Sequence, residues 1–314
     1  MARKREYRKR ITTIAQQIGK MRRRGIIINN EQKAIYALTD IGYYRLGYYI
    51  FPFEVNYPEL GRYRDRNVIS GTTFEQIISF YEYNTALRQI LSKALSRLEV
   101  SLRANIVNKL SMKYQTDPFW YIDKNIVEES FINDFYAQIY QPTIRGKGPI
   151  VRHHKKYNGR VAPIWKTIEF TTIGFLENLY NNLLSNADKC LVSLAWAEQA
   201  IGKFSNYLSV LREVRNACAH GGVIVDLKLS NPVKAGSMAC PTIPVGEQNT
   251  LRSALRVITY MMTYISTFEA REMMEELFLA TKELLNVAPN LESFIEGKTG
   301  LCNTLQATKK NLLC

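Results

Sequence analysis

The sequence predicts an all-α protein whose core is a bundle of antiparallel helices. In residues 74–110, apolar side chains recur at helical spacing with no glycine or proline to interrupt them. A second stripe, formed by Tyr207, Leu211, Val214 and Cys218, repeats every three or four residues. Stretches that alternate apolar and polar residues, as a half-buried strand does, are scarce. These three observations favour packed helices over a sheet.

The composition indicates a polyanionic partner. The chain has 314 residues, enough to bury a sizeable core. It carries 42 Lys and Arg residues against 28 Asp and Glu residues, a formal net charge of +14. This excess favours nucleic acid, because basic side chains neutralise phosphates. A basic protein with no such partner is the alternative.

The cysteines and the apolar runs predict a location. The five cysteines, at positions 190, 218, 240, 302 and 314, form no CxxC pair and show no regular spacing. They predict free thiols in a reducing compartment rather than a disulfide framework or a zinc site. No signal peptide is expected, and no apolar run approaches the roughly 20 residues of a membrane-spanning helix. We therefore expect a cytoplasmic protein that does not enter a membrane.

Residues 1–30 form the first expected part, a basic N-terminal segment. Residues 1–24 hold ten Lys or Arg residues and one Glu, and Ile11, Ile14 and Ile18 predict a short amphipathic helix. A solvated charged face is the alternative to RNA contact. The basic side chains expected to contact RNA here are Arg3, Lys4, Arg5, Arg8, Lys9, Arg10, Arg22, Arg23 and Arg24.

Residues 31–287 form the expected helical domain. It opens on an aromatic stretch in which Tyr43, Tyr44, Tyr48 and Tyr49 favour packing between helices over stacking on bases. A loop at 56–73 then leads into the long helix. Within that helix, Glu99 and Arg103 lie one turn apart. They predict an exposed ion pair, with an orienting contact to an active-site arginine as the alternative for Glu99.

Residues 111–162 predict a connection with smaller helices, which ends in a basic, Gly- and Pro-punctuated loop at 141–160. No cysteine or carboxylate lies at ligand spacing from its two histidines, so no metal site is expected. The side chains expected to face RNA, or else solvent, are Arg152, His153, His154, Lys155 and Lys156.

A helix is expected to begin at Pro163. The helix that carries the apolar stripe from Tyr207 to Cys218 should end at Gly221-Gly222, because glycine readily adopts the left-handed conformation of a helix cap. Residues 223–250 predict a loop with a short hairpin, and 251–287 predict the last helical region. Residues 288–314 are expected to be a tail.

Four segments resemble the Abi-like (Abi-D/F-like) abortive-infection proteins of the HEPN superfamily. They are IGYYRLGYYIFPF at 41–53, RLEVSLRA at 97–104, the PIW…E…G…L…Y order from Pro163, and RNACAH at 215–220. They occur in the family's order, and the resemblance covers about residues 31–285. The resemblance implies a HEPN-like helical bundle with an elaborated N-terminal region. It also implies a loop after the motif helix, which is the helix that carries residues 215–220.

The resemblance implies a metal-independent endoribonuclease that acts in anti-phage defence by abortive infection. One form that this defence can take is that the enzyme is the toxin of a toxin–antitoxin pair. Its catalytic residues would be Arg215, Asn216 and His220, and Glu169 would face their cleft. Imidazole can exchange a proton with the 2′-hydroxyl and the leaving 5′-oxygen, and guanidinium can hold the phosphate, so the expected product is a 2′,3′-cyclic phosphate. No cofactor is expected. The substrate would be cellular or phage RNA.

One helix brings these groups together poorly. At about 100° per residue, Arg215 and His220 lie about 140° apart around the helix. HEPN proteins solve this, as the resemblance implies, by joining two motif helices across a homodimer. The first alternative is a non-cleaving HEPN protein that holds, or is regulated by, a small structured RNA. The second is a helical interaction protein in which His220 is only a helix cap.

Overall fold

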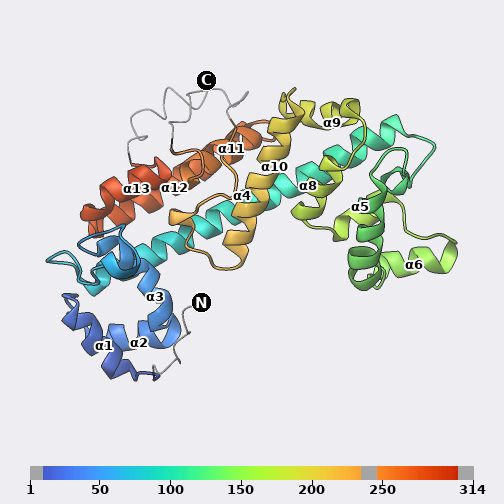
Figure 1. Cartoon of the computed structure of the whole chain (residues 1–314). Coiled ribbons are helices and arrows are strands. Elements are labelled where there is room, and N and C mark those ends of the chain that lie inside the picture. The colour runs from blue at the N-terminus through green and yellow to red at the C-terminus, as the bar shows by residue number, and fades with distance from the viewer. Residues whose placement is uncertain (1–9, 235–245, 303–314) are drawn as a thin grey trace, which may run out of the picture. The chain divides into compact units, whose positions relative to one another are not determined.

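The computed structural model describes residues 10–234 and 246–302, and over these ranges it consists of helices, turns and isolated bridges, with no named strand (Figure 1). The predicted all-α fold is confirmed. The α-helices are α1 (Ile14–Arg23), α2 (Glu31–Asp40), α3 (Tyr43–Ile50), α4 (Phe74–Lys113), α5 (Glu129–Asp134), α6 (Gly148–Lys156), α7 (Ile164–Thr167), α8 (Ile173–Asn181), α9 (Asn186–Ser193), α10 (Ile201–Ala219), α11 (Leu251–Thr263), α12 (Thr267–Val287) and α13 (Glu292–Thr299).

Short 3₁₀ turns and one π-helical stretch connect these helices. They are η1 (Phe51–Phe53), η2 (Gly61–Tyr63), η3 (Trp120–Ile122), the π-helical η4 (Phe135–Ile144), η5 (Ile168–Phe170), η6 (Leu194–Trp196), η7 (Ile224–Asp226) and η8 (Pro289–Leu291). In the described part of the chain, no helix combines the length and the apolarity that crossing a membrane requires.

The chain divides into two compact units. Of the described residues, the first unit takes 10–86 and 279–296, and the second takes 87–234, 246–278 and 297–302. The division falls within α4, α12 and α13, so each of these helices contributes one part to either unit.

The first unit has an aromatic core. Tyr49 and Phe53 are buried and both pack edge-on against Phe80 of α4. The hydroxyl of Tyr49 accepts a hydrogen bond from Asn84 Nδ2 at 3.0 Å, which satisfies two buried polar groups at once. The expected packing role therefore holds for Tyr49 but not for Tyr44, which is 83% exposed.

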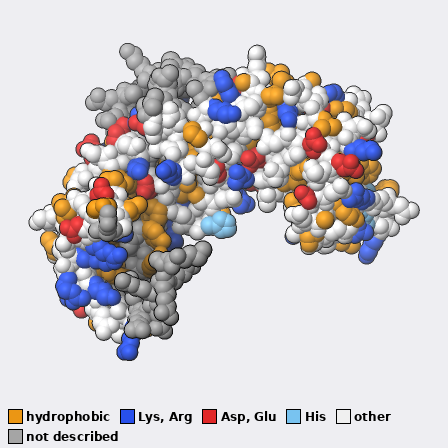
Figure 2. All heavy atoms as spheres, in the orientation of Figure 1, with side chains coloured by type: hydrophobic (Ala, Val, Ile, Leu, Met, Phe, Trp, Pro, Cys, Tyr) orange, Lys and Arg blue, Asp and Glu red, His pale blue; other side chains and the backbone are white. Residues whose placement is uncertain are grey.

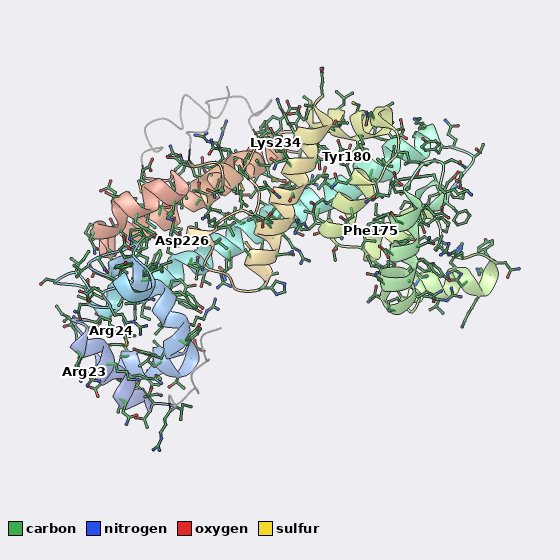
Figure 3. All side chains as sticks on the ribbon, in the orientation of Figure 1. Arg23, Arg24, Phe175, Tyr180, Asp226 and Lys234 are labelled. Atoms are coloured by element: carbon green, nitrogen blue, oxygen red, sulfur yellow. The ribbon has the colours of Figure 1, made fainter. Side chains whose placement is uncertain are left out.

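The second unit is built around α10. Its stripe of Tyr207, Leu211, Val214 and Cys218 is buried, as predicted. The helix packs against α8, α9 and α11. The rings of Tyr180 on α8 and Phe204 on α10 lie 5.2 Å apart, centroid to centroid, and Figure 3 labels Tyr180 on α8. Helix α10 is thus held on several sides and offers a rigid frame for the residues at its C-terminus.

Two predicted segments differ from the structure. The expected helix after Pro163 is divided into α7, η5 and α8, because Thr171 and Thr172 adopt extended backbone angles between them. The last helical region is divided into α11 and α12. Residues 264–266 separate them, and the hydroxyl of Ser266 accepts a hydrogen bond from the backbone N–H of Glu269 at 3.1 Å, which caps α12.

Candidate functional site

The C-terminus of α10 is fixed by a glycine cap. Gly221 has a φ of 68°, in the left-handed region, and its N–H donates to the carbonyl of Cys218 at 3.3 Å. The N–H of Gly222 donates to the carbonyl of Ala217 at 2.7 Å. These two bonds form a Schellman motif and satisfy carbonyls that the helix end would otherwise leave unpaired. The predicted end of the helix is confirmed.

His220 stands at this cap with an exposed side chain. Its backbone N–H donates to the carbonyl of Asn216 at 2.9 Å, so the residue itself is held in place. Of the chain's three histidines, His153 is buried and His154 is half-buried, so His220 is the one that solvent reaches freely. The backbone of His220 is therefore held in place, while its imidazole ring is accessible to solvent.

Arg215 lies half-buried on the same helix. Among the described residues, the hydrogen bond of its side chain is to the Oδ1 of Asn216, a long contact of 3.5 Å from Nη1. This contact is at the limit of hydrogen-bond geometry and holds the guanidinium weakly. Arg215 and Asn216 therefore retain most of their capacity to donate hydrogen bonds.

Arg212, one turn earlier, is engaged in the fold. Its Nε donates to Glu177 on α8 in an ion pair, and its Nη2 donates to the hydroxyl of Ser209 at 3.2 Å. A Cβ built on Gly174 of α8 would lie 3.4 Å from the Arg212 side chain, an ordinary van der Waals contact, so the arginine side chain packs beside Gly174. Neither Arg212 nor Glu177 was predicted from the sequence. The one available signal was that Arg212 precedes Arg215 by three residues and so lies near it on the helix.

Cys218 holds the end of α10 against α4. Its thiol shares a hydrogen bond with the hydroxyl of Ser92, and burial raises the pKa of Cys218 to about 11. The thiol is thus neutral near pH 7 and serves packing rather than chemistry. This contact places the long helix α4 beside α10.

Glu99 and Arg103 form the predicted ion pair, but the prediction that it is exposed is wrong. The side chains of Arg103 and Glu99 are 16% and 13% exposed. Arg103 Nη2 also donates to the carbonyl of Thr171 at 2.6 Å, just before α8 begins. The pair is covered because this contact draws the α7–α8 connection onto α4. Through this hydrogen bond, Arg103 holds the start of α8 in position against α4.

Glu169, which the resemblance implies would face the cleft of Arg215, lies on η5. It is exposed and lines a pocket whose lining residues all belong to 149–170. None of these lining residues comes from α10. Arg215, Asn216 and His220 thus lie near the C-terminal end of α10, and Glu169 lies with residues of α6 and α7 around this pocket.

The N-terminal basic side chains are only partly described. Arg3, Lys4, Arg5, Arg8 and Lys9 lie outside the described residues. Of the others, Arg10 and Arg23 are exposed, Arg22 forms an ion pair with Glu31 at 2.7 Å, and the Arg24 guanidinium lies 5.9 Å from the centre of the Tyr43 ring. Figure 3 labels Arg23 and Arg24 on and just after α1, and Figure 2 shows the basic side chains that gather over this part of the first unit.

The second basic set lies on a helix, so its prediction as a loop is wrong. Pro149, near the N-terminus of α6, suits a helix start, and Ile150 and His153, three residues apart, are buried together. Arg152, Lys155 and Lys156 remain exposed.

The two histidines of α6 are held by aromatic neighbours. The Tyr140 hydroxyl accepts from the N–H of Ala162 at 2.7 Å and lies 2.8 Å from His154 Nε2. The ring of His153 lies 5.1 Å from that of Tyr157. Burial lowers the pKa of both His153 and His154, and nearby cations lower it further, Lys166 beside His153 and Arg145 beside His154. Both rings are therefore neutral at pH 7.

In the part of the chain that the structure describes, no group of three or more His, Cys, Asp or Glu side chains lies close enough together to hold a metal ion.

Comparison with known proteins gives one match. A family model described as Abi-like protein matches residues 36–226, which is more than half of the chain and includes Arg215, Asn216 and His220. No curated protein and no solved structure matches the chain.

Proposed function

The chain belongs to the Abi-like protein family, and we propose that it is an endoribonuclease of the HEPN type that acts in bacterial anti-phage defence by abortive infection. The observation that carries the proposal is the contrast on α10. Arg212 is paired with Glu177, whereas Arg215 makes one weak contact, to Asn216, within the described part of the chain, and His220 is exposed. Polar groups that the fold does not use are available to a substrate.

The proposed reaction is an internal transesterification of RNA. A base removes the proton of the 2′-hydroxyl, the 2′-oxygen bonds to phosphorus, and the bond from phosphorus to the 5′-oxygen breaks as an acid protonates that oxygen. The products are a 2′,3′-cyclic phosphate and a 5′-hydroxyl. His220 supplies one of the two proton transfers. Arg215, aided by Asn216, binds the phosphate and offsets the charge that builds on it.

A homodimer completes the proposed site. Arg215 and His220 lie about 140° apart around one helix, so one copy of α10 presents them to different sides. A two-fold contact between two copies of α10 would set Arg215 of one chain beside His220 of the other. Ala217 and Ala219 at the helix end are small and allow a second backbone to approach.

The test is cleavage of a labelled RNA by purified protein. His220→Ala is expected to lower the rate by about 10²–10⁴-fold with little loss of RNA affinity, because it removes a proton-transfer group. Lys203→Ala, which removes a basic side chain near the other end of α10, is the matched control and should retain full activity. Products that carry no 2′,3′-cyclic phosphate, or full activity of His220→Ala, would refute the proposal.

A non-cleaving RNA-binding protein is the second candidate, and the 140° separation on a single chain favours it if no dimer forms. Sequencing of the RNA that co-purifies with the protein distinguishes the two. One defined structured RNA, bound intact by a chain that does not cleave it, is the result expected of this candidate.

A further inference from the structure

The second unit contains a basic, aromatic pocket that is formed by α6 on one side and by α7 and η5 on the other. Its cavity volume is about 530 Å³. Its lining includes Arg152, His153, Lys156, Trp165, Lys166 and Glu169. Three cations against one carboxylate leave this lining with a positive charge, which suits an anionic ligand.

Trp165 gives the pocket a stacking surface. The indole is 49% exposed, although tryptophan is usually well covered in a folded domain. The chain's other two tryptophans, Trp120 and Trp196, are fully buried. An exposed indole beside lysines and an arginine is the combination that binds a nucleobase and its phosphate, because every base has a π-face.

His153 points to a ligand independently. It lines the pocket at 7% exposure, and its Nδ1 is buried with no hydrogen-bond partner among the described residues. Buried polar atoms are nearly always paired, so an unpaired one in a pocket wall indicates a group that the bound state supplies. The wall of this pocket therefore contains a polar atom, His153 Nδ1, whose hydrogen bond the described residues do not supply.

We propose that this pocket binds one nucleotide of single-stranded RNA, with the base stacked on Trp165 and its phosphate held by Arg152, Lys156 and Lys166. Glu169 would accept hydrogen bonds from the amino group of the base. The proposal rests on RNA as the ligand of the proposed function. It assigns Glu169 to binding in this pocket rather than to the cleavage site at His220.

The experiment uses adenosine monophosphate, which has no phosphodiester bond to cleave and so tests the pocket apart from the nuclease. Trp165 is the exposed fluorophore of the full-length chain, and saturable quenching of its emission is expected on titration. Adenosine should bind at least about 10-fold more weakly, because it lacks the phosphate that makes charge-assisted hydrogen bonds. Trp165→Phe should abolish the change in fluorescence.

Lys166→Ala should weaken binding of the nucleotide about 10-fold, whereas Lys109→Ala, an exposed helical lysine of the same unit outside the pocket, should not. A single-stranded RNA should displace the nucleotide, also in the His220→Ala background. The proposal would be overturned if the nucleotide caused no saturable quenching and Trp165→Ala bound RNA as tightly as the wild type. The exposed indole would then be assigned to contact with a protein partner. Nucleotide binding that RNA does not displace would overturn the assignment to RNA.

Discussion

Arg212 and Glu177 form an ion pair that joins α10 to α8, with the side chains 36% and 11% exposed. Arg215, one turn along α10, makes no such pair among the described residues. Two arginines three residues apart on one helix therefore serve different purposes. One fixes the helix, and the other remains available to a substrate phosphate in the proposed nuclease.

The first prediction separates these two roles. Arg212→Ala should lower the free energy of unfolding by about 1–3 kcal/mol, because it leaves the mostly buried Glu177 carboxylate without its cation. Arg215→Ala should lower it by less than about 0.5 kcal/mol, since its contact is weak. Urea unfolding followed by circular dichroism measures both. Equal losses for the two variants would contradict the division of roles.

The second prediction concerns the helix cap. Gly221→Ala should cost about 1–2 kcal/mol, because its φ of 68° is unfavourable for a residue with a Cβ. It should also lower RNA cleavage, since the cap positions His220. Gly202→Ala is the matched control in the first turn of α10, where a Cβ meets no atom within 4 Å. It should stabilise the protein by about 0.5–1 kcal/mol. The opposite order of stabilities would contradict the cap assignment.

The sequence predicts the helices and the end of α10 well, because both depend on local signals. The stripe from Tyr207 to Cys218 has the spacing of a buried helix face, and Gly221 has the conformational freedom that a cap needs. These features need no knowledge of what the helix packs against.

Long-range contacts limit the prediction of the site. Arg103 was expected on the surface because its ion pair with Glu99 is local, and its bond to Thr171 joins residues 68 apart in the sequence. His153 was expected in a loop because glycine and proline punctuate its segment, yet Pro149 lies near the start of a helix instead. Trp165 follows Pro163 by two residues, and a single aromatic residue near a helix start does not indicate a pocket.

The third prediction is a loss of stability in mild acid. Burial lowers the pKa of His154 below 6.5 in the folded chain, so the unfolded chain binds more protons as the pH falls through that value. The free energy of unfolding should therefore decrease between pH 7.5 and pH 5.5. His154→Gln, whose side-chain amide can also form a hydrogen bond with the Tyr140 hydroxyl, should show a smaller decrease. Urea unfolding at the two pH values measures it, and an unchanged decrease would exclude His154 as a source.

The fourth prediction concerns the basic surface of the first unit. Arg10 and Arg23 are exposed, so each can neutralise one RNA phosphate and release its counterions. The variant Arg10→Gln/Arg23→Gln should reduce the slope of log K against log salt by about 1.4, which is two contacts at about 0.7 each for single strands. Lys109→Gln/Lys124→Gln removes the same charge from exposed lysines elsewhere and should leave the slope unchanged. Equal slopes for all three proteins would place the phosphates on other residues.

The last prediction tests whether two chains share one active site. If Arg215 of one chain works with His220 of the other, a heterodimer of Arg215→Ala and His220→Ala chains holds one intact site and one site that lacks both side chains. Each homodimer of a single variant holds no intact site. Coexpression of the two variants with different affinity tags, followed by purification on both tags, isolates the heterodimer. It should recover about half of the wild-type cleavage rate, because one site of two is intact. Heterodimers that are as inactive as either homodimer would show that both side chains must come from the same α10, and the shared-site proposal would then fail.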